Sequence, residues 1–276
     1  MVLSKLPIQR CNTLSTIDEI EESNVLVLGI PLYDGRPYKF VSPSNLLRIH
    51  THVVESNISG SESYTDILKI YDLGDITSSS YEHLDTDLPT ILNQVRSQYG
   101  DRKYIFIGGD HSITYFTVKN LDVDTLVVLD AHLDLKDTYL HRRFNHATVF
   151  RRLLDTEEDI KILYYGVRGY DEEEFLYARE NRNIHILDRI EDIELYDLGN
   201  TYISIDLDAF DPSLIRQVEY PEPNGITLNE VFNLFKIIST HTQITSIDIV
   251  EYLPNQIDRS ELTLILRTLH QAAYHM

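Results

Sequence analysis

Short apolar runs rich in β-branched residues recur along the chain and alternate with longer segments of helical periodicity. Several of these runs are apolar at consecutive positions, which is typical of strands buried on both faces of a parallel sheet. They are VLVLGI from Val25, KYIFIGG from Lys103, TLVVLDA from Thr125, IKILYYGV from Ile160, TYISIDLDAF from Thr201 and ITSIDIVEY from Ile244.

Four intervening segments have the spacing of amphipathic helices, with expected starts at Asp85, Asp171, Thr227 and Ser260. Thr227 and Glu230 have the N-cap and N3 spacing of a capping box. Alternating strands and helices predict parallel βαβ units with right-handed crossovers. We therefore expect an α/β fold with a doubly wound, mostly parallel sheet flanked by helices.

Neither a linker rich in Pro, Gly or Ser nor a repeat of fixed period divides the sequence, which predicts a single domain over residues 1–276. Residues 57–64, 135–145 and 216–225 are expected to form irregular loops. In an open α/β sheet, ligands bind at the loops beyond the carboxyl ends of the strands. The ends of the expected strands are therefore the first place to look for chemistry.

The 44 acidic and 24 basic residues give a formal net charge of -20, which argues against nucleic acid as a partner because phosphate binding needs a basic face. An anionic membrane surface would repel such a chain too. Cys11 is the single cysteine, so the chain has neither an internal disulfide nor a cysteine-based metal cluster. No apolar run suits a signal peptide or a membrane span. A cytoplasmic location is the expectation.

Acidic and histidine side chains gather where three of the expected strands end. They are Asp130, His132 and Asp134 in TLVVLDAHLD, Asp206 and Asp208 in TYISIDLDAFDP, and Asp110 and His111 in KYIFIGGDHS. Residues spaced by two point the same way along a strand. Taken singly, such residues are usually helix caps or turn residues. Converging carboxylates, however, repel one another unless protons or cations intervene, which indicates a divalent metal site.

The expected ligand set contains carboxylates and imidazoles and no sulfur. Its members are His111, Asp130, His132, Asp134, Asp206 and Asp208. Such ligation suits manganese or a related first-row ion. Two bridging carboxylates would hold two ions about 3.5 to 4 Å apart, an arrangement that makes hydroxide from water near neutral pH. Hydrolysis is therefore the expected reaction class. Asp211, which precedes Pro212, is expected to shape a turn instead.

Three motifs resemble the signature motifs of the ureohydrolases, the family that includes arginase, agmatinase, formimidoylglutamase and guanidinobutyrase. They are GGDHS at residues 108–112, DAHLD at residues 130–134 and SIDLDAFDP at residues 204–212. The similarity runs in matching order from about Gly29 to Pro254, so it covers most of the chain. It implies an arginase-like fold and the hydrolysis of a guanidino substrate.

The resemblance also implies a role for each candidate residue. One manganese would be held by His111, Asp130, Asp134 and Asp206, and the other by Asp130, His132, Asp206 and Asp208. A metal-bridging hydroxide, steered by Asp134, would attack the guanidinium carbon and release urea and an amine. His146 matches a histidine proposed as a proton shuttle, and Glu251 matches the glutamate that pairs with the substrate guanidinium.

The segment DTYLHRRFNHATVFRR from Asp137 is more similar to agmatinases than to arginases. The expected substrate is therefore agmatine, a small cation that would yield putrescine and urea in polyamine biosynthesis. Relatives commonly form trimers or hexamers, which implies a homo-oligomer.

One segment departs from the family pattern. RQVEY at residues 216–220 replaces a small, Gly-rich stretch of agmatinases, and Asn224 replaces a glycine. Glu219 would offer an anionic group at the pocket mouth and Arg216 a cationic one. Arginase, guanidinobutyrase or formimidoylglutamase activity therefore stays open, as does a non-catalytic relative that keeps its metals. A deacetylase of the distantly related arginase-like fold would normally use a single zinc with fewer ligands.

Overall fold

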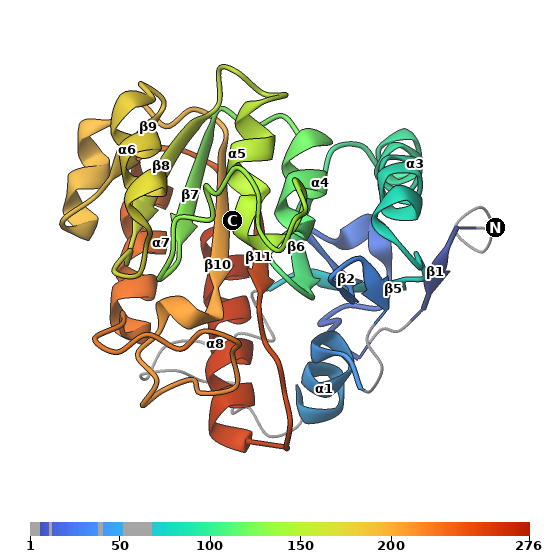
Figure 1. Ribbon diagram of the computed structural model, residues 1–276. Coiled ribbons are helices and arrows are strands. Elements are labelled where there is room, and N and C mark those ends of the chain that lie inside the picture. Colours follow the sequence, from blue (N-terminus) through green and yellow to red (C-terminus); the bar gives the residue numbers. More distant parts are fainter. Residues whose placement is uncertain (1–5, 11–12, 38–40, 52–67) are drawn as a thin grey trace.

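The computed structural model describes residues 6–10, 13–37, 41–51 and 68–276. A nine-stranded sheet lies at its centre (Figure 1). In spatial order its strands are β1 (Ile8–Gln9), β5 (Ile70–Ile76), β2 (Val25–Ile30), β6 (Lys103–Gly108), β11 (Ile244–Val250), β10 (Thr201–Asp206), β7 (Thr125–Leu129), β8 (Lys161–Tyr165) and β9 (Ile184–Ile186). All neighbouring strands are parallel except the pair β1 and β5. A separate antiparallel pair is formed by β3 (Leu32–Tyr33) and β4 (Arg36–Pro37).

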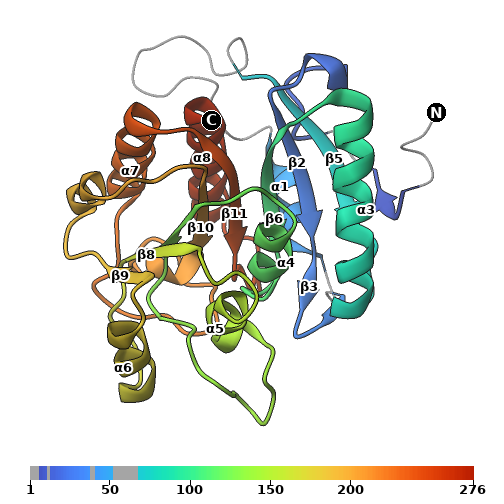
Figure 2. The same cartoon turned by 90° about the horizontal axis from the view of Figure 1, so that it is seen from above.

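Helices cover both faces of the sheet (Figure 2). One face packs against α1 (Pro43–His50), α7 (Leu228–His241) and α8 (Arg259–His275), and the other against α3 (Tyr81–Tyr99), α4 (Ile113–Lys119), α5 (Val149–Leu154) and α6 (Glu172–Glu180). Successive strand residues alternate between the two cores, as Val27 and Leu28 of β2 do. The expected doubly wound, mostly parallel α/β sheet is thereby confirmed.

The described residues also form short 3-10 helices. They are η2 (Ile20–Glu22), η4 (His146–Thr148), η5 (Ile190–Leu195) and η6 (Leu207–Ala209). No helix among the described residues is both long enough and apolar enough to cross a membrane.

All six strands expected from apolar runs are present. The helices expected from Asp171 and Thr227 are capped by those residues, and Thr227 forms the expected capping box with Glu230. Two expected helix starts were wrong. The helix expected from Asp85 begins after Ser80, whose hydroxyl accepts the His83 N–H. The helix expected from Ser260 begins after Asp258, whose carboxylate accepts two backbone N–H groups.

The expected loops have separate outcomes. Residues 57–64 lie outside the described part of the chain. Residues 135–145 and 216–225 contain no helix or strand, although an isolated bridge joins Tyr139 to Arg142.

β5 was not expected because two buried aspartates interrupt its apolar pattern. Both are paired with Arg48 of α1, whose guanidinium donates to Asp72 Oδ1 and Oδ2 at 2.9 Å each and to Asp75 Oδ1 at 2.5 Å. Ser44 donates a further hydrogen bond of 3.0 Å to Asp75. Burial alone would lower the pKa of Arg48, but the two carboxylates raise it above its usual value. This network ties α1 to the sheet.

Replacing Arg48 with Met would leave two buried carboxylates without a counter-ion. We expect the free energy of unfolding, measured by urea denaturation, to fall by about 3 to 5 kcal/mol. Arg96→Met is the matched control, because Arg96 pairs with Asp101 at the exposed end of α3, and it should cost less than about 1 kcal/mol. Equal losses in the two variants would contradict a special role for the buried network.

Candidate active site

Four strands that are consecutive neighbours in the sheet carry the candidate site residues at their carboxyl ends. These strands are β6, β11, β10 and β7. His111 follows β6, Asp130 follows β7, Asp206 ends β10 and Glu251 follows β11. Because the four strands are parallel, their carboxyl ends share one edge, and the side chains converge there.

The side chains of this edge form two overlapping groups of possible metal ligands. The groups are His111 with Asp130 and Asp206, and Asp130 with His132 and Asp208. Within each group the ligand atoms lie within 4.8 Å of one another. Asp130 belongs to both groups, as a bridging ligand would. Asp134 contacts the first group, because its Oδ2 lies 3.1 Å from His111 Nδ1. All six residues expected as ligands are thus brought together.

The spacing of two within the motifs fixes one oxygen of each carboxylate. Asp130 Oδ1 accepts the backbone N–H of His132 at 2.6 Å, and Asp206 Oδ1 accepts that of Asp208 at 2.8 Å. Asp208 Oδ1 in turn accepts the N–H of Ala131 at 3.0 Å, which joins the ends of β7 and β10. The second oxygens of Asp130 and Asp206 are left to face the centre of the site, whereas that of Asp208 lies 2.9 Å from His132 Nδ1.

His111 Nδ1 faces three such oxygens. It lies 3.2 Å from Oδ2 of Asp130, 3.1 Å from Oδ2 of Asp134 and 3.2 Å from Oδ2 of Asp206. It is fully buried, and neither this nitrogen nor Asp130 Oδ2 makes a hydrogen bond of acceptable geometry. Ligand atoms that surround a cation have this arrangement, since each points at a common centre and not at its neighbours.

The other nitrogen of His111, Nε2, makes a hydrogen bond on the side away from the carboxylates. Ser204 Oγ donates to Asp248 Oδ1 at 2.6 Å, so at 2.9 Å it accepts a hydrogen bond from His111 Nε2. Tyr202 and Thr114 also donate to Asp248, each at 2.8 Å. When the imidazole is neutral with its proton on Nε2, the lone pair of Nδ1 points to the same centre as the carboxylate oxygens, and this is the form that binds a metal.

Electrostatics give the same result. Burial, with Asp208 and Asp134 close by, raises the pKa of Asp130 well above its usual value. Burial and Asp208 raise the pKa of Asp206 to about 7. Burial would lower the pKa of His111, but the surrounding carboxylates raise it well above normal. The raised pKa values mean that these groups retain protons because negative charge is clustered here, and a divalent cation that displaced the protons would offset the same charge.

His132 and Asp208 pair in the second group, with His132 Nδ1 2.9 Å from Asp208 Oδ2. Burial would raise the pKa of Asp208, but His132 and the N–H of Ala131 lower it below its usual value. Asp208 therefore stays ionised, as a metal ligand must be.

Two candidate residues have strained backbones. Asp134 has φ 51° and Glu251 has φ 64°, in the left-handed region that costs residues other than glycine about 1 to 3 kcal/mol. The Glu251 N–H donates to Gly109 O at 2.8 Å, and its Oε1 accepts the N–H of His111 at 2.8 Å. A Cβ at Gly109 would lie 1.6 Å from Leu32 O, so only glycine allows this close approach.

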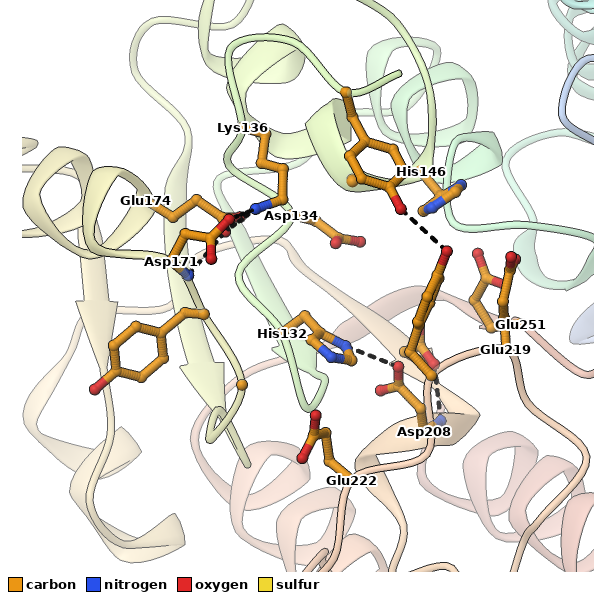
Figure 3. Close-up of a pocket in the computed structure, with 16 residues that line it drawn as sticks. His132, Asp134, Lys136, His146, Asp171, Glu174, Asp208, Glu219, Glu222 and Glu251 are labelled. Carbon is orange, nitrogen blue, oxygen red and sulfur yellow. Dashed lines mark hydrogen bonds and ion pairs between the residues drawn. The ribbon is translucent and has the colours of Figure 1, made fainter.

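A cavity of about 250 Å³ opens over the site (Figure 3). It is lined by four of the candidate metal ligands, His132, Asp134, Asp206 and Asp208, and also by His146 and Glu251. His146 Nε2 is buried and makes no hydrogen bond within the described chain.

Two loops close one side of this cavity. Tyr139 and Tyr220 join them through their hydroxyls, 3.1 Å apart, and the Tyr220 ring lies 6.2 Å from those of His132 and His146. Tyr139 and Arg142 exchange two backbone hydrogen bonds of 2.9 Å around Leu140 and His141, both with positive φ. Such a two-residue turn is usually built from Asn and Gly. The loop at residues 135–145 is thus held in a specific conformation that places Tyr139 over the cavity.

Some residues singled out in the sequence lie elsewhere. Asp110 turns away from the metal-ligand groups and accepts hydrogen bonds from Tyr81 and from the N–H of Asp34. Asp211 shapes a turn, as expected, by accepting the N–H groups of Ser213 and Asn224. Glu219 lines the cavity, whereas Arg216 does not.

Several lining residues carried no signal in the sequence. They are Lys136, Tyr139, Gly169, Tyr170, Asp171, Glu174 and Glu222. Asp171 was expected only as a helix start, and a capping carboxylate looks the same in a sequence whether or not it borders a pocket.

Comparison with known proteins gives a consistent result. The sequence profile of the Arginase family matches residues 23–273. An agmatinase of Pyrococcus horikoshii is 34% identical over 258 residues, which cover 90% of this chain and 89% of the relative. An N(1)-aminopropylagmatine ureohydrolase of Thermococcus kodakarensis is 30% identical over 243 residues and 84% of each chain. The crystal structure of agmatine ureohydrolase of Thermoplasma volcanium superposes with a TM-score of 0.79 at 27% identity, covering 99% of this chain and 95% of that one.

The strand order, the converging ligand groups and these matches agree with the resemblance of the three motifs. The chain belongs to the arginase family.

Proposed function

We propose that this protein hydrolyses agmatine to putrescine and urea with two manganese ions as cofactors. As a ureohydrolase of the arginase family it is an amidinohydrolase that acts on guanidino groups. The proposal concerns the tail of the substrate, the metal and the role of each residue.

The choice of substrate rests on the charged residues that line the cavity outside the candidate metal ligands, a region called the outer cavity below. Apart from the candidate metal ligands, the charged lining residues are Asp171, Glu174, Glu219, Glu222, Glu251 and Lys136. The single cation among them, Lys136, is already paired with Asp171 and Glu174. A carboxylate on the substrate tail would meet negative charge without a free cation, whereas an amine would be attracted. This favours agmatine over arginine, guanidinobutyrate and formimidoylglutamate.

The relatives support a guanidino amine as the substrate. Their names specify agmatine for the protein of Pyrococcus horikoshii and N(1)-aminopropylagmatine for that of Thermococcus kodakarensis. The second of these has a longer tail with one more amine. It is the second candidate here, because the carboxylate of Glu219 extends the negative lining to the exposed end of the cavity.

The oxygen-rich ligand set favours manganese. His111, Asp130, Asp134 and Asp206 would hold one ion, and Asp130, His132, Asp206 and Asp208 the other. When bound, the ions supply an activated water near neutral pH and positive charge for the tetrahedral transition state. The family resemblance supports a homo-oligomer, trimer or hexamer, as part of the proposal, and the single cysteine supports a cytoplasmic location.

Three side chains would act on the substrate and on its proton. Glu251 uses one carboxylate oxygen to accept the His111 N–H, which leaves the other for the guanidinium and orients the carbon. Asp134 accepts a hydrogen bond from the attacking water and directs it. His146 Nε2, which has no hydrogen bond within the described chain, would carry a proton to the departing amine.

Manganese affinity should rise with pH. Metal binding requires ionised carboxylates, and below pH 7 protons compete at Asp206, whose pKa is raised to about 7. We expect calorimetric titration to give an affinity about tenfold higher at pH 8 than at pH 6 from the Asp206 proton alone, because its pKa of about 7 lies midway between the two. Asp130→Asn should weaken binding at both pH values, and Asp211→Asn, at a turn outside the cavity, should not. Equal wild-type affinities at pH 6 and pH 8 would contradict this account.

Urea release tests the proposed reaction directly. Manganese-loaded protein should produce urea from agmatine and little or none from arginine or guanidinobutyrate, because the cavity offers no free cation to their carboxylates. Asp134→Asn, which keeps the side-chain shape, should abolish the activity. Urea from arginine or guanidinobutyrate instead would reject the substrate assignment and keep the chemistry. Urea from none of them, with two bound manganese ions, would favour a non-catalytic role.

His146→Asn tests the proton relay. We expect kcat for agmatine to fall about a hundredfold with little change in KM, and added imidazole to restore part of the rate. His241→Asn removes an exposed histidine from α7 and should leave both constants unchanged. A rise in KM without a fall in kcat, or no response to imidazole, would argue that His146 only shapes the cavity.

A further inference from the structure

The acidic side chains of the outer cavity differ in whether their charge is already balanced. Asp171 and Glu174 both bind the ammonium group of Lys136. Figure 3 shows these three side chains together on one side of the cavity, apart from His132. A cation arriving on that side would have to compete with Lys136.

The remaining acidic residues are not equivalent either. Glu251 accepts the N–H of His111, and Glu219 accepts a hydrogen bond from the hydroxyl of Tyr33. The carboxylate of Glu222 has neither a hydrogen bond nor an ion pair within the described residues, although it lines the cavity and is only partly exposed. It is therefore the carboxylate of the outer cavity that is most available to a ligand.

Glu222 is held in a fixed place relative to the metal-ligand groups. The guanidinium of Arg168 donates to the backbone oxygens of Glu222 and Asp208 at 2.8 Å each, and to that of Pro223 at 3.0 Å. Pro221 and Pro223 flank Glu222 and restrict the backbone on both sides. The side chain is thus attached to the same guanidinium that holds the loop of a candidate metal ligand.

The space beside Glu222 is kept open by a glycine. A Cβ at Gly169 would lie 3.2 Å from His132 Nε2 and 3.3 Å from Glu222 Oε1. Any larger residue there would fill the gap between the candidate metal ligand and the free carboxylate. In Figure 3 the two side chains face the same opening, with Glu222 below His132.

We propose that Glu222 binds the positively charged amine at the far end of the substrate and so selects guanidino amines over guanidino acids. The inference rests on the proposed function, since it assigns the tail of the same substrate. The guanidinium lies at Glu251 on one side of the site, and the tail runs past His132 to Glu222. A carboxylate held in place and free of partners forms a charge-assisted hydrogen bond without first breaking another.

The test compares two substrates that differ by one charge. Agmatine ends in an ammonium group, and pentylguanidine has a methyl group in its place. For Glu222→Gln we expect the KM for agmatine to rise about 10-fold to 100-fold with little change in kcat, because one charge-assisted hydrogen bond is lost. The KM for pentylguanidine should not change, because that tail has no charge to recognise.

The controls separate charge recognition from structural damage. Glu172→Gln removes the same charge from the exposed first turn of α6, outside the cavity lining, and should change neither KM. Glu222→Lys should reverse the preference and favour guanidinobutyrate over agmatine. Equal effects of Glu222→Gln on both substrates, or no effect on either, would overturn the inference.

Failure of this inference remains distinct from failure of the proposed function. If the wild-type protein releases no urea, the calorimetric dissociation constants of agmatine and pentylguanidine replace KM in the same comparison. A selective loss of agmatine binding in Glu222→Gln would then support Glu222 as the amine site, although the hydrolysis had failed. An equal dissociation constant in wild type and variant would reject the amine site.

Discussion

The constraint on which the site depends is the concentration of buried negative charge at one edge of the sheet. Parallel pairing of β6, β11, β10 and β7 brings their carboxyl ends to one edge of the sheet. The acidic and histidine residues of the three motifs follow these ends and therefore lie close together. Backbone N–H groups fix one oxygen of Asp130, Asp206 and Asp208, so those oxygens cannot turn away to relieve the repulsion. Behind them, Ser204 and Asp248 hold His111 with a lone pair facing inward. The arrangement is favourable only when positive charge occupies its centre.

Elsewhere in the chain, buried carboxylates are balanced by a side-chain cation. Asp72 and Asp75 are also buried carboxylates, on strand β5, but Arg48 supplies a permanent cation and the group is complete without a ligand. At the carboxyl edge no lysine or arginine approaches the described ligand groups in this way. The strained backbones of Asp134 and Glu251 lie at that edge as well, where a rigid scaffold of parallel strands can maintain them. Structural and functional carboxylates are thus distinguished by the source of their counter-charge.

Sequence patterns predicted those parts of the molecule that depend on local order. Apolar runs located the six main strands, and the motifs DAHLD and DLD located the candidate ligands. Most of these ligands lie beyond the ends of β7 and β10, so the spacing of two acts there through carboxylates that accept the backbone N–H two residues on, and not through strand alternation. β5 was missed, since the reason that Asp72 can be buried lies in Arg48, which is distant in sequence. The contact between Tyr139 and Tyr220 was missed for the same reason, because it joins residues 81 positions apart across two loops. Pairing between distant loops leaves no periodic signal in one sequence.

Charge recognition in the cavity shows why composition alone cannot identify a substrate. A net charge of -20 attracts every cation and distinguishes none of them. Discrimination between substrates begins where the charges of the lining are balanced unequally. Lys136 neutralises part of the lining, whereas the Glu222 carboxylate has no partner among the residues that the structure describes. The guanidinium and the amine of one substrate would then be bound at two separate carboxylates, with the metal-ligand groups between them. A molecule with only one cation, or with an acid at its far end, would pair with one of these carboxylates and leave the other unpaired. Its binding would lose one contact and would also bear the free-energy cost of a carboxylate removed from water without a partner.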